Sequence, residues 1–565
     1  MNTRLWTQRE KRWLRCALLA AFAVRLALTA ATGGYTYDMS CFAAWGDKLA
    51  QQGPAAFYAD GYFADYPPGY LPVLGAVALL RNGLGLSYES AAAHLLLVLV
   101  PSLCDAATAA LVFCTARRWA VGEAAARRLT LFAAFCPVLL YDTAIWKQID
   151  GAFALPLVLC FWWMEQKRWA PACLAYGAAL AVKPQALLFG PVLAVCFFWL
   201  LAEEKTPLGR LKTVGKTAAG AALALAPPLL AGLPFYGFAR LAPSLLDKYR
   251  STATGYLYAT INAFNWFAAL GGNWQAMDAP AIGPLTWQML GVANLAALTA
   301  GLAALAAYSA RKKQFSPLLL AAVYGMGVYT FAHCMHERYM VAGVLLVLLA
   351  AARWNDRRLF GAGVGFSLIG LNNLAAVYTQ VGGSDEWLNS ATSVGLTRIL
   401  GFAETACFLL LLYAALDLVR GGARLPLDAA APAAPCLPQP VKAVRRAARG
   451  AQTDAARGKA AGTGTPPAAP ALLAVPAPQP AWTRREAWAL AALTALTALF
   501  SYAYLGDTTA PQTALETVGA AASEAFLLAG ETVPATLWVY PGINDVLAGR
   551  DVQMDAARAK TQPGG

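Results

Sequence analysis

Apolar residues in this chain form long stretches that are separated by short segments rich in arginine and lysine. Many stretches approach the roughly 20 residues that a helix needs to cross about 30 Å of hydrocarbon. The pattern predicts an all-α polytopic membrane protein, built as a bundle of about 13 transmembrane helices. The expected spans are residues 13–33, 91–115, 129–145, 151–166, 170–183, 186–202, 216–234, 285–309, 316–333, 338–352, 358–378, 398–419 and 486–505.

One apolar stretch, GYLPVLGAVALL at residues 69–80, is expected not to cross the membrane. At about 12 residues it is shorter than a span, and a crossing here would move every later basic segment to the opposite side. Pro67 and Pro68 are expected to end one surface helix and to turn the chain into a second. Residues 34–90 are therefore predicted to form a long first external loop that carries two interfacial helices.

The basic segments set the predicted orientation, because lysine and arginine are enriched in cytoplasmic loops. They lie at residues 4–15, 117–128, 167–168, 205–216, 311–313, 353–358 and 420–485. Placing them inside puts the N-terminus in the cytoplasm and most of the unusual polar residues outside. These external residues are Asp38, Asp65, Asp142, Lys147, Asp150, Lys183, His336, Glu337 and Arg338. An active site on the external face follows as a hypothesis.

Composition agrees with a membrane protein and argues against two other classes. Of the 565 residues, 58% are hydrophobic and 13% are charged, with a mean hydropathy of +0.48, which exceeds what a soluble core carries. The net charge of +13 comes from the basic loop segments, so nucleic acid is not an expected partner. Most of the 11 cysteines fall in apolar stretches without metal-ligand spacing, so neither a metal nor another cofactor is expected.

The distribution of residues predicts four regions. Residues 1–420 form the transmembrane domain, and residues 421–484, rich in alanine, proline and arginine, form a disordered cytoplasmic linker. Residues 485–505 form the last transmembrane helix. Residues 506–565 form a short external tail, whose apolar runs resemble the start of a truncated β-domain but are too few for a sandwich of about 100 residues.

Two carboxylates in the predicted first loop are candidates for chemistry. Asp38 begins a segment in which Phe42, Trp45 and Leu49 follow at helical spacing, and it either caps that helix or faces a substrate. Asp65 directly precedes the Tyr-Pro-Pro of residues 66–68. It either caps the turn or lies near Asp38 on the external face.

Two cationic segments are candidates for phosphate binding. In FAHCMHERYM, His336 and Arg338 could hold an anion with Glu337 orienting them, or they could form a loop ion pair. His333, His336 and Glu337 make only a weak set of metal ligands. Lys183 precedes a helix-breaking proline near membrane level, where it either contacts phosphate or extends to the interface.

Two further loops could contact a sugar. YDTAIWKQIDGAF contains Asp142, Lys147, Gln148 and Asp150, which either line a sugar site or form a solvated loop. The segment at residues 256–274 contains Asn262 and Asn265 among aromatic residues. It either contacts sugar or is an interfacial wedge of tyrosine and tryptophan.

Together these motifs resemble those of the GT-C class of polyprenyl-phosphate-sugar-dependent glycosyltransferases. The resemblance is closest to the dolichyl-phosphate-glucose glucosyltransferases of asparagine-linked glycan assembly and their bacterial relatives. It rests on Asp38 with Trp45, on Asp65 to Pro68, on SYES at residues 87–90, and on His336, Glu337 and Arg338, and it covers residues 1–420. Arg338 stands where the family has lysine, which keeps the charge but changes its geometry.

The resemblance implies a metal-independent, inverting glycosyltransferase in the bacterial plasma membrane. A hexose would pass from a polyprenyl-phosphate carrier to a hydroxyl of a lipid-, glycan- or protein-linked acceptor. Asp38 would be the catalytic base. His336, Arg338 and Lys183 would contact the donor phosphate, with Glu337 orienting them. The residues expected to bind substrate are Asp65, Tyr66, Asp142, Lys147, Gln148, Asp150, Asn262 and Asn265.

Two other functions stay open. A transporter or flippase of a lipid-linked glycan should place ionisable groups near the bilayer midplane and often shows internal repeats. Here the ionisable groups gather toward one predicted face. A polymerase or ligase that uses a diphosphate-linked oligosaccharide would share the external site.

Overall fold

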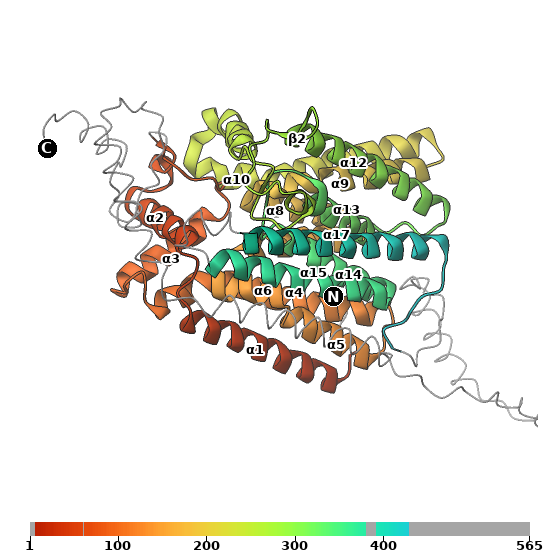
Figure 1. The fold of residues 1–565 in the computed structure, drawn as a ribbon, viewed down its shortest axis with the longest axis horizontal. Coiled ribbons are helices and arrows are strands. Elements are labelled where there is room, and N and C mark those ends of the chain that lie inside the picture. The colour runs from red at the N-terminus through yellow and green to blue at the C-terminus, as the bar shows by residue number, and fades with distance from the viewer. Residues whose placement is uncertain (1–5, 60–61, 380–390, 429–565) are drawn as a thin grey trace, which may run out of the picture.

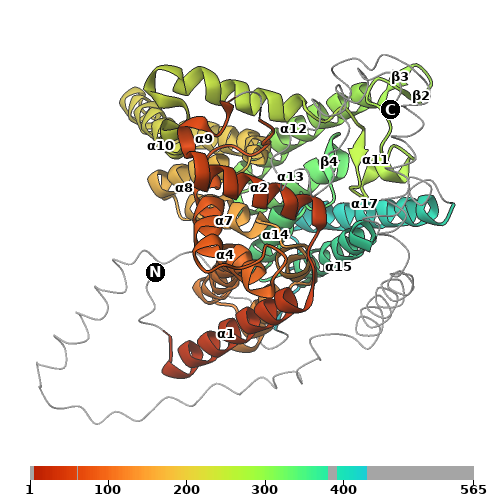
Figure 2. The same cartoon turned by 90° about the vertical axis from the view of Figure 1, so that its left-hand side faces the viewer.

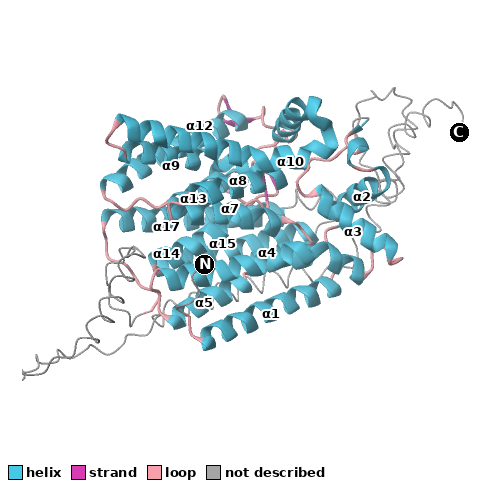
Figure 3. Ribbon diagram, turned by 180° about the vertical axis from the view of Figure 1, so that it is seen from behind, coloured by secondary structure: helices cyan, strands magenta, loops and turns pink. Residues whose placement is uncertain are grey.

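The structure of the protein is a computed structural model, which describes residues 6–59, 62–379 and 391–428. Figure 3 shows that helices make up most of this part of the chain. Eight helical runs within it are long and apolar enough to cross a membrane. They are α1 (Gln8–Ala31), α4 (Ala91–Arg118), Glu123–Trp146, Pro184–Glu203, α10 (Pro207–Thr254), α12 (Trp287–Arg311), α15 (Arg357–Thr379) and α17 (Ala391–Arg420). The prediction of an all-α membrane protein is confirmed at this level.

Four of the predicted spans are shorter helices, namely α7 (Asp150–Glu165), α8 (Trp169–Val182), α13 (Pro317–Phe331) and α14 (Val341–Trp354). They are largely buried within the bundle, and in α14 every residue except Arg353 is buried. The sequence pattern does not separate such helices from membrane spans, because protein-facing and lipid-facing positions are equally apolar. The predicted span at 486–505 lies outside the described residues, so the count of thirteen stays a prediction.

Two helices, α2 (Thr36–Gln52) and α3 (Leu71–Gly83), lie in the predicted first loop and pack against each other at one end of the molecule (Figure 1). A Cβ on Gly46 would lie 2.8 Å from the carbonyl oxygen of Leu74, so the glycine permits this close approach. The apolar face of α2 is covered by the protein itself, since Phe42 and Trp45 are buried in a cluster with Leu71.

The prediction that Pro67 and Pro68 end the first of these helices is wrong. α2 ends at Gln52, where Gly53 follows with a φ of 74° and the short helix η2 (Pro54–Ala56) begins. A positive φ is accessible to glycine without strain. The two prolines lie instead just before α3.

Basic residues gather at the opposite end of the bundle from α2 and α3. Arg117, at the end of α4, is 2.8 Å from Glu10 at the start of α1. At the same end Arg353 pairs with Glu165 at 2.7 Å. The antiparallel helices α1 and α4 extend from these ion pairs to the region of α2. The bundle therefore has a basic end and an opposite end that carries the polar loops.

The helix α10 has 48 residues and bends at Gly237, whose φ of 63° and ψ of 165° interrupt the helical backbone. The predicted span 216–234 lies in the segment before this break, which contains Pro227, Pro228 and Pro234. A second helical segment follows the break, and α10 as a whole runs along the upper edge of Figure 2. Beyond the bend, Lys248 donates to the carbonyl of Ala64, so this half of α10 covers the loop that contains Asp65.

Two short sheets complete the fold. Strands β1 (Thr260–Ile261) and β4 (Met335–His336) pair in parallel, with Ile261 opposite His336. Strands β2 (Pro280–Ile282) and β3 (Leu285–Thr286) form an antiparallel hairpin before α12. The first sheet fixes the loop that follows α10 to the loop between α13 and α14.

Candidate active site

Asp38 lies in the first turn of α2, and only one of its carboxylate oxygens is engaged. Oδ2 accepts hydrogen bonds from Trp146 Nε1 and Gln148 Nε2, each at 2.6 Å, and lies 3.6 Å from Arg338 Nη1. Oδ1 takes no hydrogen bond from any described residue, and the side chain is 21% exposed. The carboxylate is therefore oriented through one oxygen and open at the other.

The alternative that Asp38 merely caps α2 is not supported. The N-cap residue is Tyr35, which makes no capping hydrogen bond through its side chain, and the Asp38 carboxylate bonds to side chains outside the helix. The position still matters electrostatically, because the N-terminus of a helix favours a negative charge.

The two donors to Asp38 come from an unusual turn. The short helix α6 (Pro137–Leu140) continues into a π-helical turn, η4 (Tyr141–Trp146), and Lys147 follows in the left-handed region with a φ of 70°. This conformation lets Trp146 and Gln148 both reach Asp38 while the side chain between them points elsewhere. The Trp146 ring also stacks on Tyr35 with centroids 4.1 Å apart, which fixes the indole.

Lys147 contacts the end of α1 instead of the site. Its Nζ donates to the carbonyl of Thr32 at 2.5 Å and lies 3.2 Å from the Thr32 hydroxyl. A cation at the C-terminal end of a helix is favourable. Burial lowers the pKa of Lys147 to about 8. The structure thus places Lys147 as a connection between α1 and η4.

Arg338 contacts three carboxylates. Its Nη1 lies 2.6 Å from Glu337 Oε1 and 3.6 Å from Asp38, and its Nε lies 3.8 Å from Asp150 Oδ2. The side chain is only 14% exposed. Because charge pairs are weakly screened in such a site, Arg338 fixes the relative positions of the three acids.

Lys183 is the second cation of this cluster. Its Nζ lies 2.5 Å from Asp150 Oδ1 and 5.2 Å from the centre of the Tyr66 ring. Tyr66 donates in turn to Gln148 Oε1 at 3.2 Å. Side chains from distant parts of the sequence thereby form one cluster, which we call the Asp38–Arg338 site. Its members are Asp38, Tyr66, Gln148, Asp150, Lys183, Glu337 and Arg338.

His336 lies on β4 beside the Asp38–Arg338 site. Its ring packs edge-on against Tyr256, with centroids 4.7 Å apart, and against Tyr339 at 5.0 Å. Burial, together with the charges of Arg338 and Lys183, lowers the pKa of His336 well below its usual value. Its buried Nε2 has no hydrogen-bond partner among the described residues. The imidazole therefore has a buried nitrogen that is available to a ligand.

Asp65 lies at the other edge of the site, under α10. Its Oδ2 accepts from the Tyr256 hydroxyl at 3.2 Å, and Oδ1 is buried without a partner among the described residues. Burial, and next the charge of Asp38, raise the pKa of Asp65. These contacts do not cap the turn. Asp65 is therefore a buried carboxyl group whose pKa is raised by its surroundings and by Asp38.

Three predicted residues are not drawn into these contacts. Asp142 is buried in η4, and neither of its carboxylate oxygens has a partner in the described chain. Asn262 Oδ1 accepts from Trp274 Nε1 at 2.8 Å. Asn265 is buried, caps the short helix α11 (Trp266–Ala269) through Phe267 N, and donates to the Tyr329 carbonyl at 2.9 Å. The amide of Asn265 is thus occupied by the fold.

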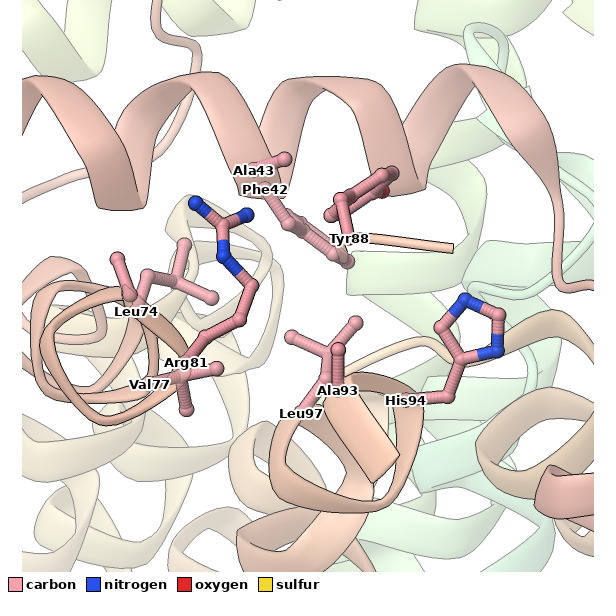
Figure 4. A pocket seen from close by; sticks show the side chains of 10 residues that line it. Phe42, Ala43, Leu74, Val77, Arg81, Tyr88, Ala93, His94 and Leu97 are labelled. Atoms are coloured by element: carbon pink, nitrogen blue, oxygen red, sulfur yellow. The ribbon is translucent and has the colours of Figure 1, made fainter. Parts of the chain in front are cut away.

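A separate pocket between α2, α3 and α4 contains none of the predicted site residues. It is lined by apolar side chains such as Phe42 and Leu97, with Arg81 and His94 on opposite sides (Figure 4). Asp47 holds the Arg81 guanidinium at 2.5 and 2.7 Å. The pocket is therefore distinct from the Asp38–Arg338 site.

Sequence reasoning missed two side chains of the site. Trp146, a direct donor to Asp38, lies within the IWKQID segment beside residues that were predicted. Tyr256, which contacts both Asp65 and His336, begins the aromatic segment at 256–274. In each case the sequence signal for a site residue was an aromatic residue close to a predicted polar residue.

Within the described ranges, no three His, Cys, Asp or Glu side chains are grouped as a metal ion would require. No protein-family model matches the chain, and no curated protein matches it. The resemblance to the GT-C class therefore stays a prediction.

Proposed function

We propose that this chain is a GT-C-type membrane glycosyltransferase that transfers a hexose from a polyprenyl-phosphate carrier to an acceptor hydroxyl. One observation carries the proposal. Asp38 is held at Oδ2 by Trp146, Gln148 and Arg338, while Oδ1 is open and the side chain is partly exposed. A general base needs this combination of a fixed orientation and a free lone pair within reach of its proton.

The proposed reaction is a single inverting displacement. Oδ1 of Asp38 takes the proton of the acceptor hydroxyl as its oxygen attacks the anomeric carbon. The new carbon–oxygen bond forms while the bond to the phosphate oxygen breaks on the opposite face. The lipid phosphate leaves with the electron pair, and the anomeric configuration inverts. Holding base and acceptor in this geometry lowers the barrier by reducing the entropic cost of the encounter.

The leaving phosphate gains negative charge, which nearby donors would stabilise. Arg338 and Lys183 are the cations of the Asp38–Arg338 site, and His336 has an unpartnered nitrogen. Burial raises the pKa of Glu337, although Arg338 opposes this shift. Raised pKa values at Asp65 and Glu337 would reduce the negative charge that the site presents to a phosphate.

The proposal includes an orientation in the membrane. The basic end of the bundle would face the cytoplasm with the N-terminus, and α2, α3 and the Asp38–Arg338 site would face outward. With the shorter buried helices and the segment at 486–505, the chain would have thirteen spans in a bacterial plasma membrane. The activated sugar would arrive on its lipid carrier, so no nucleotide would be needed on the external side.

The experiment is a donor panel. Purified full-length protein in lipid nanodiscs is incubated with several polyprenyl-phosphate hexoses and with a diphosphate-linked oligosaccharide, with and without EDTA. We expect transfer or hydrolysis of a monophosphate donor, insensitive to EDTA and abolished in Asp38→Asn. The matched control, Asp278→Asn, makes the same change at an exposed aspartate. Full activity in Asp38→Asn, or turnover of the diphosphate donor alone, would overturn the proposal.

A further inference from the structure

An open cavity of about 680 Å³ lies between α12, α13 and α17, which stack beside one another in Figure 1. Its walls are mostly leucine and aromatic side chains, among them Leu298, Leu305, Phe408, Leu412 and Leu416. Neighbouring residues of α17 that point away from the bundle, such as Tyr413, are exposed. The cavity is therefore a groove on the surface of membrane-spanning helices, and it shares no residue with the Asp38–Arg338 site.

Two polar side chains in the walls of this groove, Tyr324 and Asn294, are already hydrogen-bonded. Thr299 and Tyr324 share a hydrogen bond at 3.1 Å between their hydroxyls. Asn294 Nδ2 donates to the Phe331 carbonyl at 3.1 Å. The middle of the groove consequently presents hydrocarbon and requires no polar ligand group.

One end of the groove carries positive charge that no acid among the described residues pairs with. Arg420, the last residue of α17, lines the groove, is exposed and forms no ion pair within the described ranges. Lys312 lies 5.7 Å from the ring centre of Tyr308, another lining residue. The nearest acid along α17, Asp417, is taken by Arg358 at 2.6 Å. This end belongs to the basic end of the bundle, opposite Asp38.

We propose that this groove is a binding site for an anionic phospholipid. One acyl chain lies along the leucine-lined groove, and the phosphate lies between Arg420 and Lys312. The cavity volume falls within the range of about 300–1,000 Å³ that is typical of ligand sites. Basic side chains at the membrane surface attract anionic headgroups. The site goes beyond the proposed function, because it needs no donor or acceptor of that reaction.

The apolar segment at residues 486–505 fits the groove less well. A helix of 20 residues, about 30 Å long and 10–12 Å wide, fills roughly 2,500 Å³, several times the volume of the cavity. The segment also follows Arg484 and Arg485, whose charges have the same sign as that of Arg420. An anionic headgroup complements this end of the groove, whereas the flank of that segment repels it.

Two substitutions separate the parts of the site. Arg420→Gln removes the headgroup charge, with Arg9→Gln as the control at an exposed arginine of α1. Gly301→Leu fills the groove, since no atom lies within 4 Å of the position of its Cβ. Gly361→Leu, on α15, is the matched control, because that position is equally open and does not line the groove.

The readout is lipid binding by native mass spectrometry of the full-length protein, titrated with dioleoyl phosphatidylglycerol or dioleoyl phosphatidylcholine. We expect phosphatidylglycerol to bind more tightly, and Arg420→Gln to weaken it about fivefold without affecting phosphatidylcholine. Gly301→Leu should weaken both lipids roughly fivefold, and both controls should match the wild type. Equal affinities of Arg420→Gln and Arg9→Gln would overturn the proposal, even if Gly301→Leu does not fold.

Two further measurements test other occupants. A photoreactive diazirine side chain at Ala304, which lines the groove, should yield a phospholipid adduct on irradiation in nanodiscs. An adduct with the peptide of residues 486–505 would assign the groove to this chain itself and overturn the lipid site. The second measurement asks whether polyprenyl phosphate displaces bound phosphatidylglycerol at lower concentrations than added phosphatidylglycerol does. That result would assign the groove to the donor and overturn the phospholipid site as well.

Discussion

The Nη1 atom of Arg338 lies 3.6 Å from Oδ2 of Asp38, although the two residues belong to opposite ends of the membrane domain in sequence. The same guanidinium uses its Nε toward Asp150. This two-sided contact depends on the planar fork of arginine, which an ammonium group cannot reproduce.

Arg338→Lys should therefore keep the positive charge but lose one side of the contact. In a donor-turnover assay we expect kcat/KM to fall roughly tenfold for Arg338→Lys and about 1,000-fold for Arg338→Ala. Arg240→Lys, at an exposed position of α10, is the control and should behave as wild type. An unchanged kcat/KM in Arg338→Ala would remove Arg338 from the mechanism.

Trp146→Phe should test the orientation of Asp38. The substitution deletes the donor at 2.6 Å but keeps a ring to stack on Tyr35. Because Gln148 and Arg338 remain, we expect kcat to fall by about three- to tenfold with KM for the donor unchanged.

Trp162→Phe is the matched control, since Trp162 is also buried and donates one hydrogen bond, to Thr115 at 2.9 Å. It should lower thermal stability by a similar amount but leave kcat as in the wild type. Equal loss of kcat in the two variants would show that Trp146 acts only through the fold.

Asp65→Asn should change how stability depends on pH. Burial raises the pKa of Asp65 above its usual value. The folded protein therefore holds a proton that an unfolded aspartate, with a pKa of about 3.9, releases. This stabilisation is present at low pH and is lost as the pH rises through the interval between the unfolded and folded pKa values.

The measurement is the thermal unfolding temperature between about pH 4 and pH 7, the range above the usual aspartate pKa. Wild type should lose stability with rising pH, and Asp65→Asn, which keeps an acceptor for Tyr256, should lose less. Asp278→Asn, at an exposed position, should follow the wild type. Parallel curves for wild type and Asp65→Asn would contradict a protonated carboxyl here.

Arg25 and Asp105 form a buried ion pair, with 3.0 Å between them. Removing only one partner should strongly destabilise the protein. Asp105→Asn leaves a buried guanidinium without its counter-ion and should cost about 3–5 kcal/mol of unfolding free energy. The double variant Arg25→Met with Asp105→Leu should recover most of this loss.

Glu203→Gln provides the comparison, because its pair with Lys167 is largely exposed, and it should change stability by less than about 1 kcal/mol. Unfolding by denaturant in detergent measures all these variants. A double variant as unstable as Asp105→Asn would indicate that Arg25 acts mainly through its bond to the Ala134 carbonyl.

The sequence motifs predict the helical membrane architecture and the residues of the Asp38–Arg338 site. They do not predict which contacts these residues make. Asp38, Asp150 and Arg338 were each selected from the sequence, and the fold brings them together. The role of Trp146 depends on a π-helical turn and on Lys147 at a φ of 70°, neither of which a hydrophobic pattern encodes. Lys147 itself turns to Thr32, because side-chain direction follows local backbone geometry.

Burial explains the remaining differences. The buried helix α14 and the exposed helix α12 have similarly apolar sequences, so the pattern predicts a span for each. Asn265 occurs in an aromatic segment suited to sugar, yet its amide closes the backbone of α11. Such competition between a ligand and the chain's own unpaired groups is decided only when the loop has folded.

The pairing of β1 with β4 has a consequence for any exchange of these two loops. Ile261 pairs with His336, so the histidine and the segment with Asn262 are held together by the same two strands. A graft of residues 256–274 alone would cut that pairing in half and displace the histidine. The two loops are thus structurally one unit, and a successful chimera must transplant both strands together.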